Sequence, residues 1–308
     1  MSVTGKSGKT LYSKEAPSNN RDNPVNSMGF RGYEIGLKNP DVTRIICVGG
    51  STTYSHNLDY TETYPYLLQQ ALELKVHHNC CEVINAGQRG MNLPQINELV
   101  RMEIVELDPD VVLLMNIQNN FDAPGFWYAQ TKNSSVRPSV FNSINNMIIA
   151  RSALAWVIND IIKNILGTGT QGYFKNFDWA KFSTALMSSD NIWQEKYERN
   201  LKTFCHLLKR SNPSINIFFL EEAFNYSLHP SMQKPFQKAI EIFKKVYTAN
   251  HSTIDISTPI NRAAKRGEPV WLAPPIDPTH LSRRGNDILA DVISEHLIKK
   301  TPVFSPEL

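Results

Sequence analysis

Two segments far apart in the chain carry residue types that could perform nucleophilic chemistry together. Ser51 follows two glycines at the end of an apolar run, where the backbone can turn sharply and expose a hydroxyl. Near the C-terminus, Asp277 precedes His280 by three residues. A carboxylate at this spacing can bind one ring nitrogen, so that the other nitrogen can take a proton from a serine. The pattern predicts Ser51 as nucleophile, His280 as base and Asp277 as the carboxylate that orients it.

Two further groups could donate hydrogen bonds to a negatively charged oxygen. Gly90 ends the segment Asn85-Ala-Gly-Gln-Arg-Gly90, in which closely spaced glycines leave backbone N–H groups free to face an anion. Asn119 and Asn120 belong to an amide-rich segment that follows another apolar run. Side-chain amides at such a place can stabilise a developing oxyanion.

Each group alone also has an ordinary structural interpretation as a turn, a helix cap or a loop amide. Two better-known motifs are absent. The G-x-S-x-G elbow is not met, because Thr53 stands at its last position. The end of a phosphate-binding loop occurs at residues 8–10, but Val3 stands where its first glycine belongs and no strand precedes it. The functional hypothesis therefore depends on the four groups occurring as a set.

Alternating apolar runs and amphipathic segments would have to position these residues. Strands are predicted at 44–49, 82–85, 110–115, 215–220 and 253–256, and helices at 61–75, 93–107, 193–209, 233–247 and 281–299. This alternation predicts an α/β fold with a parallel sheet and helices on both faces. Ligand sites in such sheets lie at the carboxyl ends of the strands, which is where the first three groups occur.

The rest of the chain is divided as follows. Residues 1–40 are polar and are expected to form an N-terminal arm, residues 41–300 a single domain, and residues 301–308 a tail. Residues 121–190 interrupt the alternation with many aromatics and are interpreted as a mainly helical insertion. Its most apolar stretch, 144–166, contains Arg151, Asp160 and Lys163, so an amphipathic helix is expected there rather than a membrane span.

Composition excludes several classes of protein. The 308 residues are 41% hydrophobic and 20% charged, which is typical of a folded globular chain. A net charge of +3 does not favour nucleic acid as a partner. Four cysteines without a C-x-x-C spacing predict neither a disulfide framework nor a zinc site. No signal peptide is evident, so a cytoplasmic location is the default expectation, and the oligomeric state is left open.

With these motifs the sequence resembles the SGNH (GDSL-like) hydrolases, a superfamily of esterases, lipases and carbohydrate deacetylases. The four blocks of that family are matched by Gly49-Gly50-Ser51-Thr52, by 85–90, by Ile117-Gln-Asn119-Asn120 and by Asp277-Pro-Thr-His280 with Gly285-Asn286 beyond it. The segment 26–32 resembles one found in bacterial members that begin G-G-S-T-T. Three positions depart from the family pattern: Gly50 replaces its aspartate, Ile117 its glycine and Asn120 its second aspartate.

The resemblance implies a three-layer α/β/α sandwich with a five-stranded parallel sheet, of the SGNH or flavodoxin-like kind. It implies acyl transfer by Ser51, His280 and Asp277 without a metal or cofactor. The oxyanion donors would be the backbone N–H groups of Ser51 and Gly90 and the side chain of Asn119.

His56, Arg89 and Asn120 are candidates for contacts with a small-molecule or carbohydrate ester. Three functions remain open from the sequence. The first is an esterase, for example a carbohydrate O-deacetylase. The second is an acyltransferase with the same triad, and the third is a catalytically silent binding protein.

Overall fold

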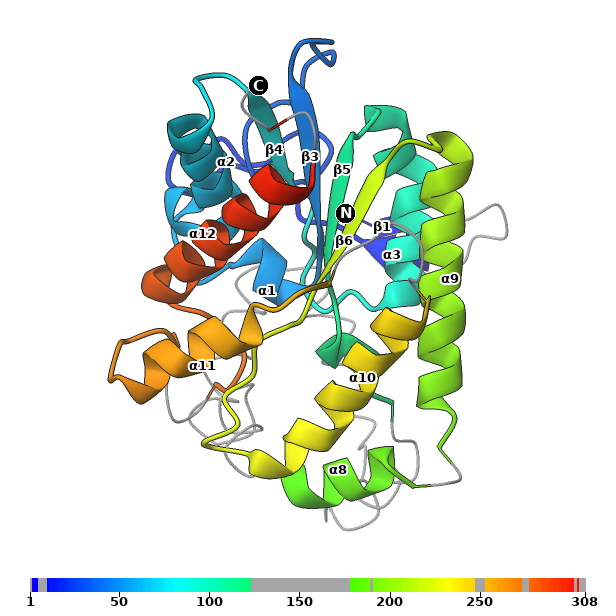
Figure 1. Cartoon of the computed structure of the whole chain (residues 1–308). Coiled ribbons are helices and arrows are strands. Elements are labelled where there is room, and N and C mark those ends of the chain that lie inside the picture. Colours follow the sequence, from blue (N-terminus) through cyan, green and yellow to red (C-terminus); the bar gives the residue numbers. More distant parts are fainter. Residues whose placement is uncertain are drawn as a thin grey trace, which may run out of the picture.

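A computed structural model describes residues 2–4, 10–122, 178–188, 191–246, 253–272, 277–301 and 304. A five-stranded sheet in the order β4-β3-β5-β6-β7, with every neighbouring pair parallel, forms its centre (Figure 1). The strands are β3 (Thr43–Gly49), β4 (Cys81–Asn85), β5 (Val111–Met115), β6 (Asn216–Leu220) and β7 (Thr253–Ile254). All five lie where the sequence predicts strands, and the α/β fold class is confirmed.

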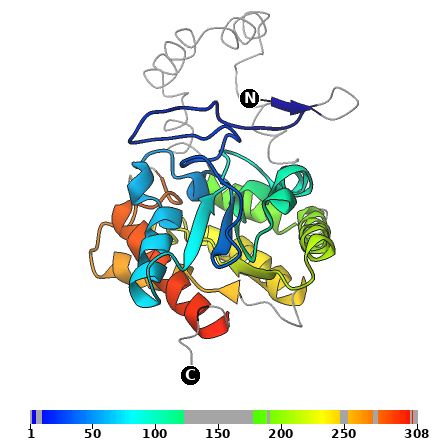
Figure 2. The ribbon, with the colours of Figure 1, turned by 90° about the horizontal axis from the view of Figure 1, so that it is seen from above.

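Helices cover both faces of the sheet because alternate strand residues point to opposite sides. Ile46 and Val112 face one side, in a core shared with α3, α9 and α10. Ile45 and Leu113 face the other side, in a core shared with α2 and α12. Figures 1 and 2 show these helix groups on either side of the sheet. The helices are α2 (Tyr64–Lys75), α3 (Leu93–Leu99), α8 (Trp179–Leu186), α9 (Trp193–Ser211), α10 (Gln233–Val246), α11 (Ser257–Lys265) and α12 (Arg283–Lys300).

Local chemistry explains where several helices begin. Pro65 lies in the first turn of α2, the place where its missing N–H and fixed φ are tolerated, so the regular helix starts at 64 rather than at 61. The Asn92 side chain accepts a hydrogen bond from the backbone of Gln95 and caps α3. Ser282 caps α12 in the same way.

Some elements differ from the expectation. The helix predicted over 93–107 is regular only as far as Leu99 and continues as a π turn (Val100–Ile104) and a 3-10 turn (Val105–Leu107). The sequence analysis did not predict α11 or the short helix α1 (Ser51–Tyr54). Most of the expected insertion, at 123–177 and 189–190, lies outside the described residues, as does the helix expected at 144–166.

The N-terminal segment contains two short strands, and one of its side chains is part of the core. Strands β1 (Ser2–Thr4) and β2 (Thr10–Ser13) pair antiparallel, and Figure 2 shows this segment running along one side of the molecule. Further on, Phe30 is fully buried in the core cluster of α3 and α9, and the backbone N–H of Arg31 donates to Asn85. Residues around 30 therefore pack as part of the domain.

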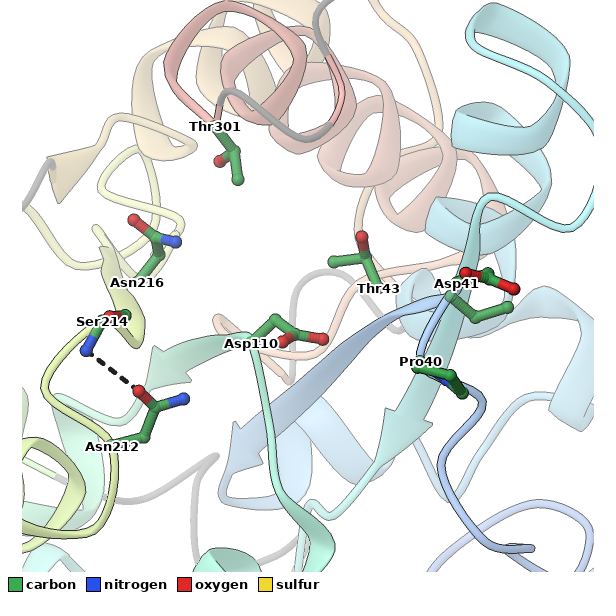
Figure 3. Close-up of a pocket in the computed structure, with 9 residues that line it drawn as sticks. Pro40, Asp41, Thr43, Asp110, Asn212, Ser214, Asn216 and Thr301 are labelled. Carbon is green, nitrogen blue, oxygen red and sulfur yellow. Dashed lines mark hydrogen bonds between the residues drawn. The ribbon is translucent and has the colours of Figure 1, made fainter.

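A cavity of about 320 Å³ opens at the amino ends of the strands (Figure 3). Thr43 and Asn216, the first residues of β3 and β6, line it together with Asp110. It therefore lies at the end of the sheet opposite the predicted site. Within the described ranges, no helix is both long and apolar enough to cross a membrane.

Candidate active site

Ser51, His280 and Asp277 form a continuous line of hydrogen bonds. His280 Nε2 lies 2.9 Å from Ser51 Oγ, and His280 Nδ1 lies 2.6 Å from Asp277 Oδ2. The side chains of His280 and Asp277 are each 18% exposed, so the site is sheltered but open to solvent. With the proton on Nδ1, Nε2 is an acceptor for the serine hydroxyl.

The Asp277 carboxylate is itself fixed by local donors. Its Oδ1 accepts hydrogen bonds from the backbone N–H groups of Thr279 and His280, both at 3.0 Å, and from the Thr279 hydroxyl at 3.1 Å. Burial acts to raise the pKa of Asp277, but the hydrogen bond and charge of His280 and the backbone donors together hold that pKa well below its usual value. Asp277 is therefore ionised and oriented toward the imidazole.

Two contacts place the segment 277–280 over the sheet. The backbone of Leu272 donates to the carbonyl of His280 at 3.0 Å, and Asn225, after β6, donates to the carbonyl of Pro278 at 2.8 Å. Gly285, in the first turn of α12, lies so close to the backbone of Val270 that an added Cβ would meet the Val270 carbonyl at 2.4 Å. Close packing at the start of α12 thus holds the histidine in reach of Ser51.

Gly50 and Asn119 are in direct contact beside the nucleophile. A Cβ at position 50 would lie 2.3 Å from Asn119 Nδ2, closer than real atoms approach. The amide of Asn119 therefore occupies the space that any side chain at position 50 would need. The absence of a side chain at Gly50 therefore leaves room for Asn119 to lie against the turn that carries Ser51.

Gly90 and Asn119 are linked through Met91. Gly90 has a φ of +70°, a conformation that favours glycine. The carbonyl of the next residue, Met91, accepts hydrogen bonds at 2.9 Å from the side chains of both Asn116 and Asn119. This bond uses one of the two N–H groups of the Asn119 amide, so the other can serve a ligand.

Ile117 and Asn120, the other two positions that depart from the SGNH pattern, both contact other parts of the protein. Ile117 is fully buried in the core that contains α3 and α9. Asn120 Oδ1 accepts from the backbone of Leu93 at 2.8 Å, and its Nδ2 donates to Asn116. Both ends of the Asn120 amide therefore have protein partners, at the start of α3 and at the end of β5.

His56 and Arg89 lie at the rim of the site. The His56 ring stands edge-on to the His280 ring, with 5.7 Å between the ring centres. Desolvation and the nearby charge of His280 lower the pKa of His56 to about 4, so its imidazole is neutral at pH 7. Arg89 forms an ion pair with Glu15 at 2.7 Å and lies over the ring of Tyr54.

Arg31 donates hydrogen bonds to the turn that follows Ser51. Its buried guanidinium donates to the carbonyl of Tyr54 at 2.7 Å, and also to the carbonyls of Ser55 and Leu58 and to the side chain of Asn23. These carbonyls belong to α1 and the loop that follows it. The N-terminal segment therefore supports the element that begins at Ser51.

Glu222 is a buried carboxylate of the site that the sequence analysis missed. It follows β6 by two residues and is 4% exposed. Its position just beyond a predicted strand was a signal that it would face the carboxyl edge of the sheet. Among the described residues, no group of three or more His, Cys, Asp or Glu side chains could hold a metal ion.

Comparisons with known proteins agree with the fold. No family model matches the sequence, and neither does any curated protein. The lipase/acylhydrolase from Enterococcus faecalis shares 14% sequence identity with the chain and superposes with a TM-score of 0.52, covering 87% of this chain and 100% of that one. Axe2, an acetylxylan esterase from Geobacillus stearothermophilus, has 14% identity and a TM-score of 0.51, covering 83% and 95%.

A third similar structure is LAE5, an α/β hydrolase from the metagenome of Lake Arreo, Spain. It has 14% identity and a TM-score of 0.52, and covers 88% of this chain and 100% of that one. The three similar structures are thus described as a lipase/acylhydrolase, an acetylxylan esterase and an α/β hydrolase. The five-stranded parallel sheet with its flanking helices therefore has the same α/β fold as these three structures.

Proposed function

We propose that the chain is a serine hydrolase that cleaves an ester with Ser51, His280 and Asp277. The observation that carries this proposal is the line of two hydrogen bonds, 2.9 Å and 2.6 Å long, that joins the three side chains at the carboxyl end of the sheet. A silent binding protein has no need for a histidine placed between a serine hydroxyl and an oriented carboxylate.

The proposed reaction has two steps, acylation of Ser51 and hydrolysis of the acyl-serine. Ser51 Oγ attacks the ester carbonyl while its proton passes to His280 Nε2, and the resulting imidazolium is stabilised by Asp277. The N–H groups of Ser51 and Gly90 and the amide of Asn119 stabilise the oxyanion. When the carbonyl re-forms, the alkoxide leaves with the proton from Nε2. Water then attacks the acyl-serine by the same proton route and releases the acid.

The substrate class is proposed from the comparisons and from the residues around the site. Axe2 is an acetylxylan esterase, and an acetylated carbohydrate is therefore the first substrate to test. His56 and Arg89 remain our candidates for substrate contacts, and Asn120, whose amide already bonds to Leu93 and Asn116, would act through its position in the loop. An acyltransferase differs only in that a second alcohol replaces water as the acceptor of the acyl group.

The deciding experiment is labelling with a fluorophosphonate probe. We expect the wild type to be labelled and Ser51→Ala to be unlabelled but folded. Ser214→Ala is the matched control, because Ser214 lines the cavity at the opposite end of the sheet and its loss should leave labelling intact. A folded wild type that resists the probe, or a labelled Ser51→Ala protein, would overturn the proposal.

A further inference from the structure

Glu222 joins two segments of the site that are distant in sequence. Its Oε2 accepts hydrogen bonds from the backbone N–H groups of Ile117 at 2.8 Å and Gln118 at 2.9 Å. Its Oε1 accepts from the Thr52 hydroxyl at 3.1 Å. Thr52 is the residue after the nucleophile, and Gln118 is the residue before Asn119. One carboxylate thus connects the ends of β3, β5 and β6.

Glu222 is buried, and hydrogen-bond donors reach both oxygens of its carboxylate. A buried carboxylate is costly unless donors satisfy its oxygens. Burial raises the pKa of Glu222, while the donors from Gln118, Ile117 and Thr52 oppose that rise. The neighbouring carboxylate, Glu221, instead pairs with Lys244 at 3.4 Å.

We propose that Glu222 is a positioning residue that sets the distance between Ser51 and the Asn119 amide. This inference rests on the proposed function, because both groups must face the same carbonyl of an ester. The hydrogen bonds of Glu222 go to Thr52, Ile117 and Gln118 and not to the three side chains of the proposed triad. It holds Thr52 on one side and the 117–118 backbone on the other, so the nucleophile and an oxyanion donor keep their relative placement.

If Glu222 has this role, its replacement should change kcat but not the affinity for the substrate. The oxyanion contact exists only in the transition state, so its misplacement lowers kcat and leaves KM nearly unchanged. A residue needed only for stability would lower the melting temperature without altering the reactivity of the molecules that remain folded.

The test compares Glu222→Ala, Glu222→Gln and the matched control Glu221→Gln. We expect Glu222→Ala to lower kcat and the rate of fluorophosphonate labelling by about 10²-fold, with KM changed less than about threefold. Glu222→Gln should recover most of the rate, because its amide oxygen can accept from both backbone N–H groups and its NH2 can donate to Thr52. Glu221→Gln should match the wild type.

The outcomes separate the two proposals. A folded Glu222→Ala protein that is labelled at the wild-type rate overturns the positioning role, while the labelled wild type still supports the hydrolase. If Glu222→Ala does not fold, Thr52→Val decides, because it removes one of the three bonds and keeps the side-chain volume. We then expect a labelling rate lower by about tenfold, and an unchanged rate contradicts the inference. A folded wild type without labelling overturns the proposed function and this inference with it.

Discussion

At the scale of single residues, the proposed chemistry depends on the tautomer of His280. Asp277 binds Nδ1 at 2.6 Å and so directs Nε2 toward Ser51. Asp277→Asn can donate a hydrogen bond and would favour the wrong tautomer. We expect kcat for an acetate ester to fall by about 10³- to 10⁴-fold.

Thr279→Val is the control for this prediction. It removes only the hydroxyl that donates to Asp277 Oδ1 at 3.1 Å and leaves the two backbone donors in place. A modest loss of kcat is expected. Equal losses in the two variants would show that the orientation of Asp277, rather than its charge and tautomer control, limits the rate.

His56 makes a prediction about stability and pH. Its pKa is lowered from the usual 6.5 to about 4 in the folded protein. Between these values the unfolded chain binds more protons, so His56 contributes to a loss of stability as the pH falls from about 6.5 toward 4. In His56→Gln the drop in unfolding free energy between pH 7 and pH 5 should be smaller than in the wild type.

Urea unfolding at the two pH values measures this difference. Part of the drop should remain, because the pKa values of His229 and His296 are also lowered by burial. The exposed His77, replaced by Gln, controls for the loss of an imidazole. An identical drop in wild type and His56→Gln would refute the assignment.

At the scale of elements, the close approach of two turns determines the geometry of the proposed oxyanion site. The turn after β3 contributes Gly50 and the turn after β5 contributes Asn119, and there is no room between them for a Cβ. We expect Gly50→Ala to displace the Asn119 amide and to lower kcat by about 10²-fold, the typical effect of losing one donor.

A double-mutant cycle checks this coupling. Gly50→Ala combined with Asn119→Ala should be little worse than either change alone, because both remove the same donor. Gly36→Ala is the matched control, since a Cβ there meets no atom within 4 Å. Full additivity of the two losses would show that Gly50 acts independently of Asn119.

The short helix α1 is supported by a side chain from the N-terminal segment. Arg31 satisfies three backbone carbonyls of α1 and the following loop. Arg31→Met removes the side-chain donor of all three carbonyls, of which Ser55 still accepts from the Leu58 N–H, and should lower the unfolding free energy by about 2–3 kcal/mol. Arg21→Met, at an exposed position, should change it little. Urea denaturation of both variants tests the difference.

At the scale of the whole molecule, the core extends into the N-terminal segment. Phe30 is fully buried among residues of the sheet and of α3 and α9. Phe30→Ala should therefore cost about 3–5 kcal/mol of stability, as for a residue of the central core. Leu37→Ala, at a side chain that is fully exposed, should have a negligible effect. Equal stabilities of the two variants would place Phe30 outside the cooperative unit.

The fold class, the five strands of the central sheet and most of the helices packed on it could be predicted from local patterns in the chain. Buried parallel strands are continuous apolar runs and amphipathic helices show a period near 3.6, so both are written locally in the chain. The sequence also predicted Ser51, Asp277 and His280, because strand ends and a D-x-x-H spacing are local features. Helix α11 was missed because its apolar positions are few and its packing against the rest of the core is not local.

The surroundings of Ser51 could not be predicted from the sequence, because they depend on tertiary packing. Glu222 is 170 residues from Thr52 in the chain, and no local pattern connects them. The same is true of Gly50 and Asn119, whose contact arises because β3 and β5 are neighbours in the sheet. Strand order brings such residues together, and strand order is a property of the packed sheet rather than of any one segment.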